Sequence, residues 1–151
     1  MYDVGVFEWY TKEIAEEETI RAYALKLKII TTYTLLVCSN KSNEIKYLND
    51  YYTKFKVRFP DFNTKKILTI DTSHDANIIG YFPEELEENL LKFKLIEKKF
   101  KYIWLCPNEL KTTKNIESID HYLKNNGYLS VITCTYTIYL FNNLEYDEFK
   151  I

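Results

Sequence analysis

Four apolar segments rich in β-branched residues recur along the chain, and stretches with helical periodicity lie around and between them. The apolar segments cover residues 29–38, 66–71, 102–106 and 128–141. The helical stretches cover residues 8–28, 43–55, 83–99 and 115–124. Regular alternation of this kind favours a mainly parallel sheet with helices on both of its faces. The pattern therefore predicts an α/β fold, a three-layer Rossmann-like sandwich.

Two of the apolar segments carry more specific information. The run from Tyr102 to Cys106 is apolar without alternation, which suits a parallel strand buried on both faces. The run from Tyr128 to Phe141 exceeds the usual length of a strand, so a bend or a hairpin is expected within it. We predict that one sheet contains the strands Leu35–Val37, Ile67–Ile70, Ile103–Leu105 and Leu129–Ile132.

The length and the terminal residues indicate the domain organisation and the compartment. A chain of 151 residues without a long linker predicts one α/β domain over residues 1–151, with the helical residues 1–28 packed on it. No stretch approaches the roughly 18 apolar residues of a membrane span, and residues 1–5 lack a signal-peptide pattern. A soluble, cytoplasmic protein is therefore expected. Only two of the 20 basic residues are arginine, a bias also found in viral and mobile-element proteins, for which the compartment would be the host cytoplasm.

Glycine content and net charge exclude several classes of ligand. The only glycines are Gly5, Gly80 and Gly127, which cannot form a glycine-rich loop around a phosphate. The formal net charge of −2 makes nucleic acid unlikely as the main ligand. Aromatic and lysine residues do interleave at 47–56, but a helical reading buries Tyr52 and Phe55 and leaves Tyr47 and Tyr51 outside.

The cysteines and histidines indicate no metal centre. Cys38, Cys106 and Cys134 are widely spaced and lie in or at the end of apolar runs, where cysteine usually behaves as a small buried hydrophobe. His74 lies near Asp71 and Asp75, a set that could ligate a metal or supply a general base. A metal would need a further ligand from elsewhere in the chain, so no metal site is predicted.

Polar residues follow three of the expected strands. In open parallel sheets, ligands bind beyond the carboxyl ends of the strands. Turns also require polar residues at such places, so each group has a structural reading beside a functional one. The three groups are Cys38-Ser39-Asn40, Asp71-Thr72-Ser73-His74-Asp75 and Cys106-Pro107-Asn108-Glu109.

A resemblance is carried by residues 100–108 and 116–132. The apolar strand ending in Leu105-Cys106-Pro107-Asn108 is followed by a helical stretch and the turn Leu123-Lys124-Asn125-Asn126-Gly127-Tyr128-Leu129. This succession resembles the second half of the class I S-adenosylmethionine-dependent methyltransferases. Where members of that superfamily have a glycine-rich turn after the first strand, this chain has Cys38-Ser39-Asn40-Lys41-Ser42.

The resemblance implies a cofactor and the residues around it. The cofactor would be S-adenosylmethionine, with Asp71 as the acid that binds its ribose hydroxyls and Ser73 in the same loop. Cys38, Ser39 and Asn40 would occupy the turn that faces the cofactor. Pro107 and Asn108 would lie where some members hold the target nucleobase or amine, and they are the catalytic candidates.

A second hypothesis belongs to another functional class. A chain without the glycine-rich turn could be a non-enzymatic interaction protein, of viral or mobile-element origin, that uses the sheet to bind a protein partner. The threonine- and tyrosine-rich run from Tyr128 to Phe141, together with Tyr146 and Phe149, is the surface expected for such a contact. Because exposed sheet edges pair with other chains, a homodimer through this region is also expected.

Overall fold

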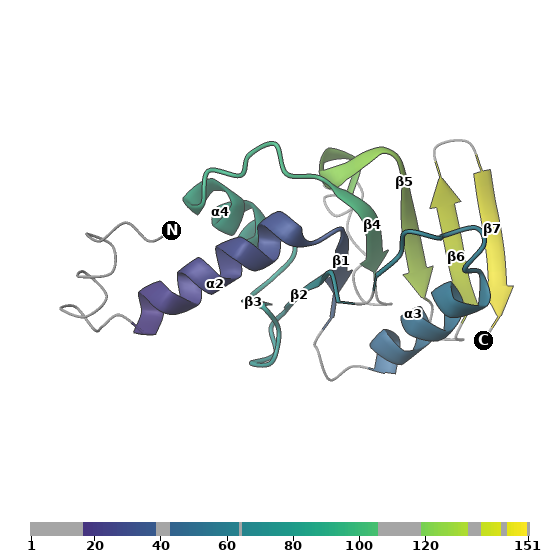
Figure 1. Ribbon diagram of the computed structural model, residues 1–151, viewed down its shortest axis with the longest axis horizontal. Helices are drawn as coiled ribbons and strands as arrows, with labels where there is room; N and C mark the ends of the chain where they lie inside the picture. Colours follow the sequence, from purple (N-terminus) through teal and green to yellow (C-terminus); the bar gives the residue numbers. More distant parts are fainter. Residues whose placement is uncertain are drawn as a thin grey trace. The chain divides into compact units, whose positions relative to one another are not determined.

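The computed structural model describes residues 17–38, 43–63, 65–105, 119–132, 137–142 and 145–150 (Figure 1). The chain divides into two compact units, Met1–Thr31 and Thr32–Ile151. The described part of the first unit is helix α2 (Glu17–Thr31), and the predicted packing of residues 1–28 on the domain stays a prediction. None of the helices in the described ranges has the length and apolar character needed to cross a membrane.

Helix α2 continues further than the sequence pattern suggested. Ile29, Ile30 and Thr31 were expected to begin a strand, but they form the last turn of the helix. The hydroxyl of Thr31 donates a hydrogen bond to the carbonyl of Leu27, at 2.9 Å. A bond to the carbonyl four residues earlier is one that a threonine side chain makes within a helix, so the hydroxyl has a partner in this last turn.

The second unit is built on one seven-stranded sheet with the order β3-β2-β1-β4-β5-β6-β7. Neighbouring strands from β3 to β5 run parallel, and the pairs β5–β6 and β6–β7 are antiparallel. This confirms a mixed α/β fold with a mainly parallel sheet, whereas helices on both faces stay a prediction. The strands are β1 (Thr34–Val37), β2 (Ile67–Asp71), β3 (Ile78–Ile79), β4 (Phe100–Leu105), β5 (Leu123–Ile132), β6 (Thr137–Asn142) and β7 (Glu145–Lys150).

The four predicted strand segments lie in this sheet, and the expected hairpin is present. Strands β5 and β6 pair antiparallel, with Ile132 opposite Ile138, so the run from Tyr128 to Phe141 does turn back on itself. Among the described strands, β7 forms the edge of the sheet beside β6, so the strand that begins at Thr137, β6, is not an edge strand. Because β6 is paired on both sides, it cannot pair with a second copy of the chain, and an edge-to-edge dimer would have to form through β7. Dimerisation itself stays a prediction.

Residues 115–124 differ from the predicted helix. Of the described residues, 119–122 are helical, and β5 already begins at Leu123. Burial raises the pKa of Tyr122 to about 12, and the charge of Glu87 adds to the rise, so this turn lies near helix α4 (Glu84–Lys92). The Asn125-Asn126-Gly127 turn does not end a helix. It forms an irregularity in β5, where Asn126 has a left-handed backbone with φ 62°.

Helix α4 is shorter than predicted. Its first turn is rich in acids, as expected, but it ends at Lys92, and the predicted stripe residue Ile96 is 62% exposed. Lys94 takes a left-handed backbone, with φ 60°. The N–H of Leu95 donates to the carbonyl of Leu90 at 2.8 Å, and the N–H of Lys94 donates to that of Leu91 at 3.0 Å. This pair of bonds is a Schellman motif, which ends the helix two residues before Lys94.

We expect Lys94→Gly to stabilise the protein by about 1 kcal/mol, because a left-handed backbone costs a residue with a Cβ roughly that much. Urea unfolding followed by circular dichroism measures the change. Lys92→Gly is the matched control, since it removes the same side chain inside the helix and should destabilise. An unchanged or lowered unfolding free energy for Lys94→Gly would contradict the assignment of this helix end.

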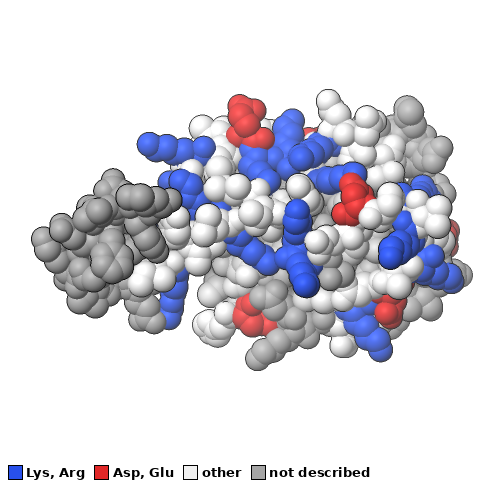
Figure 2. Space-filling view, viewed as in Figure 1, with Lys and Arg blue, Asp and Glu red and all other residues white. Residues whose placement is uncertain are grey.

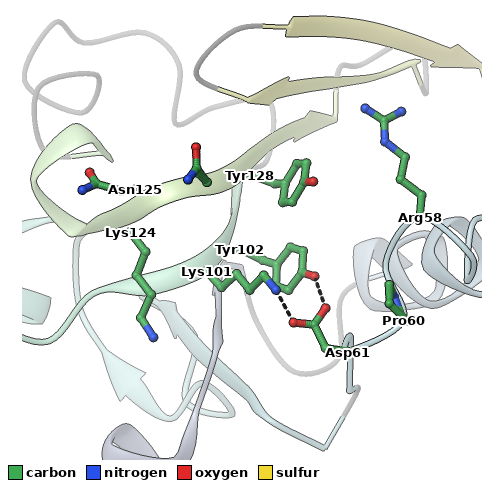
Figure 3. A pocket seen from close by; sticks show the side chains of 9 residues that line it. Arg58, Pro60, Asp61, Lys101, Tyr102, Lys124, Asn125 and Tyr128 are labelled. Atoms are coloured by element: carbon green, nitrogen blue, oxygen red, sulfur yellow. Dashed lines mark hydrogen bonds and ion pairs between the residues drawn. The ribbon is translucent and has the colours of Figure 1, made fainter.

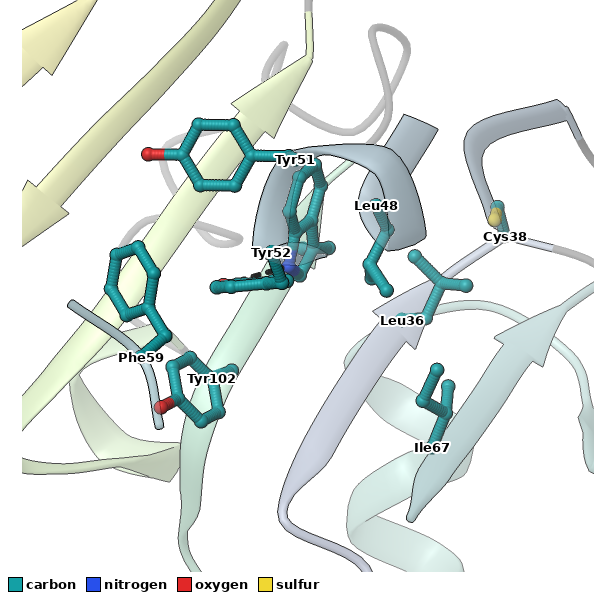
Figure 4. Close-up of a cluster of buried hydrophobic side chains, with 9 residues drawn as sticks. Leu36, Cys38, Leu48, Tyr51, Tyr52, Phe59, Ile67 and Tyr102 are labelled. Atoms are coloured by element: carbon teal, nitrogen blue, oxygen red, sulfur yellow. Dashed lines mark hydrogen bonds between the residues drawn. The ribbon is translucent and has the colours of Figure 1, made fainter. Parts of the chain in front are cut away.

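Helix α3 (Asn43–Lys54) covers an aromatic cluster on one face of the sheet (Figure 4). Tyr51 and Tyr52 reach from the helix to Trp104 on β4, and the indole N–H of Trp104 donates to the hydroxyl of Tyr52 at 3.1 Å. Tyr51 was expected outside but is only 4% exposed, because four aromatic rings surround it. The buried members of the cluster are Leu36, Cys38, Leu48, Tyr51, Tyr52, Phe59, Ile67, Tyr102 and Trp104.

Candidate functional site

The carboxyl edge of the sheet has the strand arrangement that the sequence-based hypothesis needs. Strand β1 lies in the middle of the parallel part, between β2 and β4. The chain proceeds from β1 to β2 and β3 on one side, and then crosses to β4 and β5 on the other side. The strand order therefore reverses between β1 and β4. In open α/β sheets, ligands bind in the crevice that such a reversal leaves outside the carboxyl ends of the strands.

Cys38 and Asp71 come together at this edge. Strands β1 and β2 pair as far as Leu36↔Thr69; Cys38 directly follows the end of β1, and Asp71 is the end of β2. Cys38 is buried, in agreement with its predicted role as a small hydrophobe. Asp71 is the last residue of β2 and is half-buried. A carboxylate therefore lies at the end of the strand next to β1.

The loop after Asp71 returns the chain to the sheet. The hydroxyl of Ser73 donates to Asp75 inside this loop, and the N–H of Gly80 donates to the carbonyl of Asp71 at 2.8 Å. The amide oxygen of Asn77 accepts the N–H of Thr69 at 2.9 Å, which secures the loop to the middle of β2. These bonds hold residues 72–77 in a defined conformation beside Asp71.

The loop shows no metal centre. His74 is exposed, and the described residues contain no group of three His, Cys, Asp or Glu side chains that could hold a metal ion. Ser39, Asn40, Pro107 and Asn108, and also Cys106 and Cys134, lie outside the described residues. Of the predicted site residues, the structure thus brings Cys38 and Asp71 together and keeps Ser73 in the loop that follows.

The amino edge of the same sheet carries a second feature, which the sequence reasoning missed. A cleft of about 580 Å³ opens there, between the start of β4, the start of β5 and the segment after α3 (Figure 3). Ligand clefts of open parallel sheets are expected at the carboxyl ends of the strands, so this cleft lies at the opposite edge. The residues that line it are Arg58, Pro60, Asp61, Lys101, Tyr102, Lys124, Asn125, Asn126 and Tyr128.

Asp61 is the one acid that lines this cleft, and two neighbours hold it. The ammonium group of Lys101 donates to its carboxylate, and the hydroxyl of Tyr102 donates to the other oxygen at 2.8 Å. The Lys101 bond is the main reason that the pKa of Asp61 is lowered, and the Tyr102 bond adds to it. Burial and this carboxylate in turn raise the pKa of Tyr102. The charge of Asp61 is therefore satisfied within the protein.

The signal that could have revealed the amino edge is the position of the lysines. Lys66 directly precedes β2, Lys98 and Lys99 precede β4, and Lys101 and Lys124 are the second residues of β4 and β5. In a parallel sheet all these strand starts lie at one edge, so the lysines are brought together. The net charge of the whole chain does not show this gathering.

Models of known protein families, curated proteins and solved structures were compared with the chain, and none of them matches it.

Proposed function

We propose that the carboxyl edge of β1, β2 and β4 binds the adenosine part of S-adenosylmethionine, and that the chain is a small methyltransferase-like protein. The observation that carries the proposal is the position of Asp71. Its carboxylate ends the strand next to β1, beside the point where the strand order reverses. In Rossmann-like sheets an acid at this place accepts hydrogen bonds from ribose hydroxyls.

The chemistry of ribose suits a half-buried carboxylate. An ionised carboxylate accepts hydrogen bonds from both hydroxyls, and each charge-assisted bond contributes about 1.5–3 kcal/mol. The N–H of Gly80 donates to the carbonyl of Asp71, and the side chain of Asn77 accepts the N–H of Thr69 two residues earlier. These bonds fix the backbone at Asp71, so that little conformational freedom is lost when a ligand binds. The carboxyl group is thus held ready for a diol.

The glycine content separates S-adenosylmethionine from dinucleotides. A pyrophosphate group needs a glycine-rich turn after the first strand, so that backbone N–H groups can approach it closely. Residues 38–42 contain no glycine. S-adenosylmethionine carries an amino acid moiety and no phosphate, so it needs no phosphate cradle, although the chain departs from the glycine-rich turn of the methyltransferases at this place. Ser39 and Asn40 are the polar side chains proposed to meet that moiety, and Pro107 and Asn108 to hold the methyl acceptor.

Calorimetry with S-adenosylmethionine and with its demethylated product tests the proposal. We expect both to bind, and we expect Asp71→Ala to weaken binding by at least about tenfold, which corresponds to the loss of one charge-assisted bond. ATP and NAD should bind less tightly than S-adenosylmethionine, because the chain lacks a phosphate-binding turn.

Asp50→Ala is the matched control, since it removes the same charge from an exposed position of α3. It should leave the affinity unchanged, and both variants should keep the circular dichroism spectrum of the unmodified protein. No detectable binding at millimolar ligand would end the methyltransferase hypothesis. If the Asp71→Ala variant bound S-adenosylmethionine with unchanged affinity, the ligand would not bind at this edge.

A further inference from the structure

Lysine side chains converge at the amino edge of the sheet around the ring of Tyr33. The ammonium groups of Lys66 and Lys124 lie 4.3 and 5.7 Å from the centre of this ring, although the two residues are far apart in the sequence. Backbone bonds fix Tyr33 between the starts of β2 and β4, because its N–H donates to Lys66 and its carbonyl accepts from Lys101. Tyr33 itself is 40% exposed, so a cation-flanked aromatic ring faces solvent at this edge.

The positive charges here are close enough to oppose one another. Lys98 contributes a further ammonium group, 6.0 Å from the centre of the Phe100 ring. Burial lowers the pKa of Lys98, and the charge of Lys124 lowers it further. Two cations that disfavour each other's charge are stabilised when an anion binds between them. The geometry of the three lysines therefore favours a ligand with several negative charges.

Few acidic side chains lie in the described segments around these strand starts. Asp61 is engaged by Lys101 and Tyr102, Glu97 is the one described acid in the lysine-rich segment 94–101, and Asp120 precedes β5 by three residues. In the view of Figure 2, basic side chains are spread over the described surface, with fewer acidic side chains among them. The edge is basic although the chain as a whole has a formal net charge of −2.

The cleft adds an aromatic wall to the charges. Tyr128 is half-buried and stacks on Tyr102, with ring centres 5.7 Å apart and planes inclined by 13° (Figure 3). Its ring is therefore held in a fixed orientation. Asn125 and Asn126 are exposed beside it and offer amide donors and acceptors. Arg58 and Lys124 come from two different elements that line the cleft, and a volume of about 580 Å³ is large enough for a nucleotide.

We propose that this amino edge, formed by Tyr33, Lys66, Lys98, Lys124, Arg58 and Tyr128, is a binding surface for single-stranded nucleic acid. The lysines and Arg58 contact phosphates, and Tyr128 provides a face on which an unpaired base stacks. A duplex hides the faces of its bases, and a lipid surface or an acidic peptide has no planar group that needs Tyr128. The surface is independent of the proposed S-adenosylmethionine site, since it lies at the opposite ends of the strands.

Fluorescence anisotropy with labelled oligothymidylate and oligouridylate, measured from roughly 50 to roughly 200 mM salt, tests the proposal. We expect both single strands to bind, with the logarithm of the affinity falling with the logarithm of the salt concentration. Four phosphate contacts, from the three lysines and Arg58, give a slope of about −3. Lys124→Gln should make the slope shallower by about 0.7. Tyr128→Leu, which keeps an apolar side chain on Tyr102, should weaken binding at least about fivefold with little change in slope.

Lys46→Gln is the matched control, because it removes the same charge from an exposed position near the start of α3, away from the amino edge. It should leave both affinity and slope unchanged, and circular dichroism checks the folding of every variant. The proposal is overturned by absence of binding at low salt, by equal effects of Lys124→Gln and Lys46→Gln, or by equally tight binding of duplex DNA or anionic vesicles. Binding of S-adenosylmethionine has no bearing on these outcomes.

Discussion

Replacement of Trp104 by alanine is expected to lower the free energy of unfolding by about 3–5 kcal/mol. Trp104 is fully buried, near the carboxyl end of β4, and packs against side chains of α3. Its ring contacts the rings of Tyr51 and Tyr52, with centre-to-centre distances of 6.0 and 5.6 Å. The substitution removes these contacts and leaves a cavity that the surrounding rigid rings cannot fill. Chemical unfolding followed by circular dichroism gives the free energy.

Trp104→Phe separates packing from hydrogen bonding. Phenylalanine keeps most of the aromatic volume but removes the indole N–H, which donates to the hydroxyl of Tyr52. The hydroxyl is then left in a buried position without this donor, and a loss of about 1–2 kcal/mol is expected. If the phenylalanine variant lost as much stability as the alanine variant, the hydrogen bond rather than packing would dominate the cluster, contrary to the expectation.

Gly127→Val is expected to lower the unfolding free energy by about 3 kcal/mol, because the added side chain has no room. A Cβ at this position would lie 2.8 Å from the carbonyl oxygen of Lys124 and 2.9 Å from that of Lys101. Both are backbone atoms, the first in β5 itself and the second in β4, so the clash can be relieved only if the backbone of β5 changes here and β4 and β5 separate at the amino edge. Chemical unfolding measures the loss.

Asn125→Val is the control for Gly127→Val, since it places the same side chain at an exposed position two residues earlier. It should change stability by less than about 0.5 kcal/mol. The strand separation caused by Gly127→Val should also disturb the cleft beside Tyr128, so oligothymidylate should bind less tightly to that variant at temperatures where it is folded. A fully stable Gly127→Val variant would show that the approach of β4 and β5 is looser than these distances indicate.

The sheet could be predicted from the sequence because its strands have local signals. Runs such as Ile103–Leu105 are apolar throughout, and the chain offers no alternative way of burying them. The ends of elements were less predictable, since they depend on contacts formed only in the folded chain. The Leu95 bond to Leu90 ends α4 early, and α2 continues to Thr31, beyond the predicted end of the helix. Neither effect is visible in hydrophobic periodicity.

The two edges of the sheet differed in how far sequence could predict them. Asp71 could be named as a candidate because it follows an apolar run directly, and the structure places it at the end of β2. The amino edge could not be named, because it combines residues from four strand starts that become neighbours only through the strand order. Lys66 and Lys124 meet at Tyr33 across a long stretch of chain. A pattern read along the sequence does not contain that proximity.

The central position of β1 has a consequence for how the chain is synthesised. Of the described strands, β1 leaves the ribosome first, and it can pair with β2 once residue 71 has emerged. Its other side pairs with β4, in the register Val37↔Leu105, and stays open until residues 100–105 follow. During that interval an apolar strand exposes unpaired N–H and C=O groups to other nascent chains. Strand β3 and helix α4 are made in this interval, so the time taken to translate residues 72–99 sets how long the unfinished sheet remains open to mispairing.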